Sequence, residues 1–288
     1  MLKLQIMISL GFSPCPNDTF IFYALVNKKI DLRGLDFSPV IKDVETLNQL
    51  AIKRAVDVTK ISCHAFYYLQ KDYQFLRSGG AFGRGCGPLL VQKTKDRSQK
   101  LEIKKIAIPG ELTTAFLLLK LYLSSNSSLI TPHSSFAPQK VADFLETLSF
   151  IAMPFNKIMD AVKDEKVDAG LIIHESRFTY HEYGLAKIAD LGDWWEKETG
   201  LPIPLGGIIA KKSLGTTTIK TIESLIRASV EYSMVHKEDT ISFIKNYSQE
   251  LSDDVIFKHI SLYVNNYTID IGSDGEAALN ELIKRAKK

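Results

Sequence analysis

The chain has 288 residues, 45% of them hydrophobic and 24% charged, so it is long enough to fill two lobes of about 100 to 200 residues each around real cores. Its 36 basic and 33 acidic residues leave a net charge of only +3, and the lysines are scattered rather than interleaved with aromatic residues on one stretch. Nucleic acid is therefore not an expected partner. The first residues lack a signal-peptide pattern, and no apolar run reaches the ~18 residues of a membrane span, so no membrane partner is expected.

Only three cysteines occur, Cys15, Cys63 and Cys86. They form none of the close pairs that a zinc site or a thioredoxin-like motif needs, and the six histidines show no H-x-x-x-H spacing. We therefore expect reduced thiols in a cytoplasmic protein that uses neither a metal nor another cofactor. The oligomeric state does not follow from the sequence.

The first part of the chain alternates strand-like and helix-like runs. Strands are predicted at 2–10, 35–41 and 56–62, and helices at 18–29, 43–54 and 63–72. Asn17 or Asp18 is expected to cap the first helix, and Asp43 the second. Alternation of this kind predicts parallel strands joined by crossover helices.

A glycine-rich stretch, "GGAFGRGCG" at 79–87, precedes a predicted strand at 87–92 and a charged connector at 93–105. It matches neither GxxxxGK[ST] nor a correctly placed GxGxxG, so it predicts a hinge or a close backbone approach rather than a nucleotide site.

The second series has strands at 105–110, 149–155 and 167–173, helices at 111–123 and 156–166, and a polar insertion near 125–139. A strand at 206–212 is followed by mostly helical sequence. Trp194 and Trp195 fall in a short predicted helix before a proline-rich link and are interpreted as lobe-packing residues at a hinge. The order of segments predicts a discontinuous α/β lobe (1–93 plus 206–288) with a second α/β lobe (94–205) inserted, and a ligand cleft between the two lobes.

Four polar clusters fall at the ends of predicted strands: "SPCPND" (13–18), "TKIS" (59–62), "PGELTT" (109–114) and "HESR" (174–177). The carboxyl ends of parallel strands border the ligand crevice in open α/β sheets, so the coincidence favours a binding site. Each cluster also has a plain structural interpretation. "SPCPND" is compatible with a turn and helix cap, and "PGELTT" with capping by Thr113 or Thr114 rather than anion binding.

His174 is the most informative single residue, because it ends an apolar strand and is followed by Glu175 and Arg177. An imidazole at such a position can act as a general base. Glu175 and Arg177 either support it or form a salt-bridged loop, and we favour the loop. The other five histidines are interpreted as surface or structural groups.

Seven segments, in order, resemble the 1,4-dihydroxy-6-naphthoate synthases of the futalosine route to menaquinone. They are "GFSPCPNDTFIFYALV", "DVETLN", "TKIS", "LRSGGAFGRGCGPLLV", "IPGELTTA", "GLIIHESRFTY" and "DLGDWWEKETGLPIPLGGI". The resemblance extends from near residue 10 to about residue 272. It implies a two-lobed type II periplasmic-binding-protein-like fold in a cytoplasmic lyase that cleaves cyclic dehypoxanthine futalosine to 1,4-dihydroxy-6-naphthoate and a sugar-derived fragment.

The same resemblance implies roles for individual residues. The family's catalytic histidine falls on His174, and its paired threonines fall on Thr113 and Thr114. Its substrate-contacting K-x-S tripeptide falls on Lys60, Ile61 and Ser62.

The sequence departs from the family pattern at 124–148, which is longer than expected, and at Glu111 and Leu112. Two other functions remain open. One is the chorismate dehydratase of the same pathway, which shares the fold. The other is a solute-binding protein, against which the missing signal peptide and the three unpaired cysteines argue.

Overall fold

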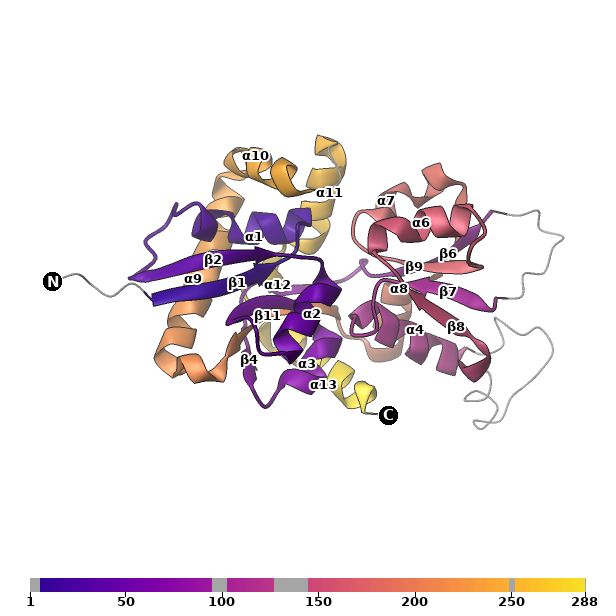
Figure 1. The fold of residues 1–288 in the computed structure, drawn as a ribbon, viewed down its shortest axis with the longest axis horizontal. Helices are drawn as coiled ribbons and strands as arrows, with labels where there is room; N and C mark the ends of the chain where they lie inside the picture. Colours follow the sequence, from indigo (N-terminus) through magenta and orange to yellow (C-terminus); the bar gives the residue numbers. More distant parts are fainter. Residues whose placement is uncertain (1–5, 95–102, 127–144, 249–251, 288) are drawn as a thin grey trace. The chain divides into compact units, whose positions relative to one another are not determined.

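The computed structural model describes residues 6–94, 103–126, 145–248 and 252–287, and Figure 1 shows its ribbon. Two compact units emerge, Met1–Gly83 with Leu201–Lys288 and Arg84–Gly200. One unit is thus made of both ends of the chain, and the division lies at 83/84 and 200/201 rather than at 93/94 and 205/206. The difference arises because the strand at 89–93 pairs with strands of the second unit. The polar insertion near 125–139 lies almost wholly outside the described residues.

The first unit is built on a mixed sheet with the order β2-β1-β3-β11-β4, and β5 also pairs with β11. Its strands are β1 (Ile6–Phe12), β2 (Leu35–Ile41), β3 (Val58–Ser62), β4 (Tyr73–Phe75), β5 (Ala81–Gly83) and β11 (Ile203–Lys211). β1 pairs in parallel with both β2 and β3, as the alternation predicts.

Eight helices complete the first unit among the described residues: α1 (Pro16–Val26), α2 (Val44–Ile52), α3 (Cys63–Leu69), α9 (Thr216–Val235), α10 (Lys237–Tyr247), α11 (Asp253–Tyr263), α12 (Asn266–Ile269) and α13 (Gly272–Ala286). Contacts group α1 with α9, α10 and α11, and α3 with α2 and α13; Figure 1 shows these two groups on opposite sides of the sheet. Aliphatic and aromatic side chains of β1, α1 and α9 form the main core, and all residues of α1 from Pro16 to Leu25 are buried.

The second unit has the strand order β10-β6-β9-β7-β8. Its elements are β6 (Leu89–Lys93), β7 (Lys105–Ile108), α4 (Thr114–Ser125), β8 (Ser149–Ala152), α6 (Phe155–Lys163), β9 (Ala169–Ile172), α7 (Ser176–Thr179), β10 (Leu185–Asp190) and α8 (Leu191–Thr199). β7 pairs in parallel with β8 and β9, whereas β6 runs antiparallel to β9 and β10. The buried Trp194 and Trp195 belong to α8, and Trp194 meets the ring of Tyr122 of the same unit edge-on.

Two expectations from the sequence are wrong. The sheets are mixed rather than parallel, because β11 runs antiparallel to β3, β4 and β5, and β6 antiparallel to its neighbours. Neither Asn17 nor Asp18 caps α1: the cap position is Cys15, which makes no side-chain capping bond, and the helix begins at Pro16. Proline suits this first position because its missing N–H would have no partner inside the helix. Asp43, by contrast, accepts a hydrogen bond from the Thr46 amide and caps α2 as expected.

Among the described residues, no helix combines the length and the apolar character that crossing a bilayer requires. Cys15, Cys63 and Cys86 are buried, and none of the three forms a disulfide. Burial raises the pKa of Cys63 far above its ordinary value, against the opposing charge of Lys60, and raises the pKa of Cys86 to about 12. Cys63 and Cys86 therefore stay protonated and are poor nucleophiles.

Candidate active site

In the first unit, two of the predicted polar clusters meet at one edge of the sheet. β1 and β3 are parallel neighbours, with Leu10 beside Val58 and Gly11 beside Thr59. Both strands therefore end at the same edge, where Ser13 and Asp18 follow β1 and Lys60 and Ser62 end β3. All four polar side chains are buried.

Lys60 and Asp18 form a buried ion pair at this edge. The Lys60 Nζ lies 3.1 Å from Asp18 Oδ1, and the two side chains are only 5% and 4% exposed. The same Nζ donates to the carbonyl oxygen of Gly79 at 2.9 Å. A buried charge needs such partners, because desolvation without them costs several kcal/mol.

Gly79 lies in the glycine-rich stretch and supports the expectation of a close backbone approach. Its φ is +84°, and a Cβ built there would lie 2.1 Å from the Cδ1 of Ile208. Only glycine fits this conformation and space without displacement of a core side chain. The glycine thus brings a carbonyl within reach of Lys60.

The rest of the K-x-S tripeptide has two different environments. Ser62 is held by Asn48, which accepts from the Ser62 amide at 2.9 Å and donates to its hydroxyl at 3.3 Å. The side chain of Ile61 is fully buried, and its backbone pairs with Gly207 of β11. Successive side chains of a strand point to opposite faces, so Ile61 serves the core while Lys60 and Ser62 share the other face.

The second unit brings the other two clusters together in the same way. β7 and β9 are parallel neighbours, with Ile106 beside Ala169 and Ala107 beside Gly170. "PGELTT" follows β7 and "HESR" follows β9, so both clusters lie beyond the same edge of this sheet. The four clusters predicted at strand ends thus lie in two pairs, one pair inside each unit.

His174 follows β9 by two residues and adopts a left-handed backbone conformation, with a φ of 56°. Few residues other than glycine adopt this region, although histidine does so more readily than most. Its imidazole meets the Phe155 ring at the start of α6 edge-on, with 4.9 Å between the centroids. Backbone conformation and ring packing therefore fix the direction of the imidazole.

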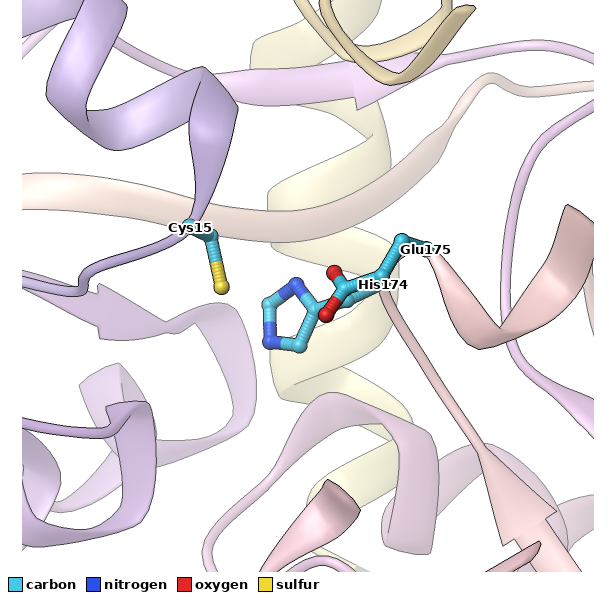
Figure 2. A group of neighbouring side chains, drawn as sticks. All are labelled: Cys15, His174 and Glu175. Carbon is cyan, nitrogen blue, oxygen red and sulfur yellow. The ribbon is translucent and has the colours of Figure 1, made fainter. Parts of the chain in front are cut away.

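Glu175 lies beside this imidazole. Figure 2 shows the two side chains on the segment that leads into α7, and a carboxylate oxygen of Glu175 lies within 4.8 Å of a ring nitrogen of His174. Cys15, also labelled in Figure 2, belongs to the first unit, where it is the cap residue of α1.

Arg177 has a structural role in the same segment. Its guanidinium lies 2.6 Å from Asp190 Oδ2 and donates to the carbonyl oxygens of Gly87 and Gly85. Asp190 also caps α8 by accepting from the amides of Gly192 and Asp193. The salt-bridged loop interpretation is confirmed for Arg177, with Asp190 as its partner.

Thr113 caps α4, and its hydroxyl is occupied by that role. It accepts from the Phe116 amide at 3.2 Å and donates to the Gly110 carbonyl oxygen at 2.7 Å. A hydroxyl has one hydrogen to donate, so Thr113 already uses its donor. Thr114 is the first residue of α4 and is 2% exposed. The predicted helix at 111–123 therefore starts three residues later than expected.

Several partners of the residues at these edges were not singled out from the sequence: Asn48, the Gly79 carbonyl, the Phe155 ring and His259. His259 received the ordinary structural interpretation, yet it is fully buried and its Nε2 lies 3.0 Å from Asn17 Oδ1. Asn48 and Gly79 fall inside two of the segments that resemble the family, but their contacts with Ser62 and Lys60 do not follow from the sequence, and His259 is 242 residues away from its partner Asn17.

Residues 8–288 match the family described as menaquinone biosynthesis. A relative from Thermus thermophilus, named 1,4-dihydroxy-6-naphtoate synthase, is 43% identical over 97% of this chain and 94% of its own length. The chain belongs to the menaquinone-biosynthesis family. A second relative with the same name, from Streptomyces coelicolor, is 40% identical over 97% of this chain and 92% of its own length.

Solved structures show the fold of this family member. A protein from Archaeoglobus fulgidus superposes with a TM-score of 0.84 at 34% identity, over 98% of this chain and 97% of its own. The ligand-binding component of an ABC-type import system from Staphylococcus aureus gives 0.66 at 12% identity, over 98% and 92%. A Candida albicans protein described as having the generic periplasmic binding protein fold gives 0.67 at 12% identity, over 98% and 90%. The predicted periplasmic-binding-protein-like fold is confirmed.

Proposed function

We propose that this protein is a lyase that converts cyclic dehypoxanthine futalosine into 1,4-dihydroxy-6-naphthoate. The observation that carries the proposal is the nearly full-length similarity to two proteins named 1,4-dihydroxy-6-naphtoate synthase. The fold alone does not separate this activity from solute binding, because the Staphylococcus aureus import component shares it.

His174 is the general base of the proposed reaction. Its neutral imidazole removes a proton from the carbon next to the substrate ketone, and aromatisation of the naphthalene ring then drives loss of the sugar-derived fragment. The fixed backbone and the Phe155 contact support this role, because proton transfer requires a base held in one direction. A carboxylate as close as that of Glu175 stabilises the positive charge that the imidazole gains.

Four of the five remaining predicted residues bind the substrate. Lys60 and Ser62 supply N–H and O–H donors for its carboxylate and hydroxyls, and Ile61 contributes through its backbone. Thr114 supplies a further hydroxyl. Thr113 holds the start of α4 in place through its capping bonds. The proposed proton transfer uses no metal or redox cofactor.

The test is incubation of the purified protein with cyclic dehypoxanthine futalosine and, separately, with chorismate. Formation of the naphthoate, followed by its absorbance, is expected only with the first compound. Dehydration of chorismate alone would instead make the protein the dehydratase of the pathway. Binding of the futalosine compound without turnover would make it a binding protein. A cytoplasmic location follows from the proposed pathway and is checked by cell fractionation.

A further inference from the structure

A chain of buried polar side chains in the first unit runs from α11 to Lys60. His259 Nε2 lies 3.0 Å from Asn17 Oδ1, and Asn17 Nδ2 donates to Asp18 Oδ1 at 3.0 Å. The same Asp18 oxygen meets Lys60 Nζ at 3.1 Å. All four side chains are less than a tenth exposed. The chain joins α11, α1 and β3, which are far apart in the sequence, and α11 packs against α1.

The Asp18 carboxylate in this chain has all its acceptor positions in use. Oδ1 accepts from Lys60 and Asn17, while Oδ2 accepts from the hydroxyl of Ser13 at 2.7 Å and from its amide at 3.2 Å. An ionised carboxylate has about four lone-pair positions. Asp18 therefore has no free acceptor position for a substrate proton, and it acts through Lys60.

The Lys60 ammonium, in contrast, keeps one donor. It has three N–H groups, and its partners among the described residues are Asp18 Oδ1 and the Gly79 carbonyl oxygen. These two partners fix the Nζ of a side chain that otherwise has four rotatable bonds. The third N–H is the one that can meet a substrate oxygen.

The orientation of the Asn17 amide links His259 to this arrangement. Its nitrogen faces the Asp18 carboxylate and its oxygen faces His259. The reverse orientation would place the amide oxygen against a carboxylate oxygen, which is repulsive. Because the amide oxygen only accepts, His259 Nε2 is the donor of the next bond.

We propose that His259 and Asn17 are positioning residues, which hold Asp18 and through it present the third Lys60 N–H to a substrate carboxylate or ketone oxygen. The proposal rests on the proposed function for the identity of the substrate. A lysine that is already ordered loses less conformational entropy when the substrate binds. The hydrogen-bonded side chains from His259 to Lys60 therefore lower KM. These side chains have no part in the proton transfer at His174, so we expect kcat to be nearly the same with and without His259.

The decisive experiment combines substitutions at His259 with substitutions at Lys60 and Asp18. His259→Leu removes the donor, whereas His259→Gln keeps an N–H group near the position of Nε2. We expect His259→Leu to raise KM about tenfold with kcat within about twofold of the parent, and His259→Gln to restore KM. In a background that carries both Lys60→Met and Asp18→Asn, so that neither charge of the buried ion pair is left without its partner, His259→Leu should raise KM no further. An equal rise in both backgrounds would overturn the proposal, because the effect would not pass through Lys60.

A second measurement needs no substrate and so separates this proposal from the proposed function. Acetic anhydride acetylates exposed lysines, and the rate at Lys60 relative to the exposed Lys71 is followed by mass spectrometry of the intact folded protein. Lys60 should react about tenfold faster in His259→Leu than in the parent or in His259→Gln. If the parent does not turn over cyclic dehypoxanthine futalosine, the proposed function is wrong and these rates still decide the positioning role. Equal rates would overturn it.

Folding is monitored by thermal melting of every variant. Should His259→Leu fail to fold, Asn17→Leu breaks the same chain one residue closer to Lys60 and carries the same expectations for KM and acetylation. Asp18→Asn is less suitable, because loss of one partner of a buried ion pair is strongly destabilising in itself.

Discussion

The two units position their polar groups at the sheet edge by different means. The first unit fixes Lys60 through side chains from β3, α1 and α11, in a buried network in which Asp18 is fully occupied. The second unit fixes His174 through its own backbone conformation and through packing against the Phe155 ring, on a loop held by Arg177 and Asp190. A flexible charged side chain needs many partners to hold it, whereas a short imidazole is directed mainly by the backbone that carries it.

The largest expected effect tests the second unit. His174→Ala should lower kcat by about 10² to 10⁴-fold, the usual contribution of a positioned general base. Substrate binding should persist, because the imidazole contributes to chemistry more than to affinity. The measurement is turnover of cyclic dehypoxanthine futalosine together with its equilibrium binding.

His181→Ala is the matched control for this variant, since His181 is an exposed histidine seven residues further along the chain. It should retain parental kcat. Normal turnover by a correctly folded His174→Ala protein would remove His174 from the mechanism.

Loss of Asp190 should show how far the loop after β9 depends on one carboxylate. Asp190→Ala removes both the ion pair to Arg177 and the cap of α8, so we expect the free energy of unfolding to fall by about 2 to 4 kcal/mol. Chemical denaturation measures it. Asp193→Ala, which removes only an exposed contact with Lys197 in the same helix, should change it little. Similar losses in both variants would contradict the assigned role of Asp190.

Variants of Thr113, which caps α4, and of Thr114, the first residue of α4, should separate helix capping from substrate binding. Thr113→Val removes the cap, and the expected loss of stability is about 0.5 to 2 kcal/mol with little change in KM. Thr114→Val should raise KM with little change in melting temperature. Both quantities are measured on each variant. A KM that rises for Thr113→Val and stays constant for Thr114→Val would reverse the assignment.

Asp57 immediately precedes β3, and it tests a charge that has no part in the proposed chemistry. Burial raises the pKa of Asp57, but hydrogen bonds from Ser9 and Lys211 outweigh it, so its pKa lies below the ordinary value of 3.8. The ionised form is therefore favoured in the folded state. Its contribution to stability is present above pH 3.8 and is lost as the pH falls through the folded value.

Asp57→Asn should accordingly be less stable than the parent at neutral pH, and the difference should shrink below about pH 4. Denaturation curves between pH 2 and 7, on the order of one per pH unit, measure this. Asp160→Asn, at an exposed position, is the control. The difference between its free energy of unfolding and that of the parent should not shrink in the same way as the pH falls. A difference for Asp57→Asn that is constant with pH would refute the predicted linkage.

The smallest expected effect is that of a chelator, which should leave turnover unchanged if no metal takes part in the proposed proton transfer. Dialysis against a chelator before the assay, with readdition of single divalent ions, tests this. Loss of turnover that one ion restores would contradict the expectation.

The sequence predicts the local part of this structure because local patterns have local causes. Most strands are found where apolar runs predict them, and Asp43 caps α2 because a carboxylate before a helix reaches its free amides. The four polar clusters come together in pairs because parallel neighbours end at the same edge of a sheet. His174 and Lys60 are proposed as site residues from the motifs that resemble the family. This too is local information, because each residue lies within one short segment of the sequence.

Tertiary structure decides what depends on residues distant in sequence. The antiparallel return of β11 beside β3, the pairing of β6 with β9, and the partner of Arg177 arise from packing over long separations. Asp18 looks like a helix cap in the sequence, but it forms an ion pair because the fold brings Lys60 and Ser13 to it. His259 joins the same network across 242 residues of sequence, a contact that no propensity or spacing encodes because it exists only once the core has formed.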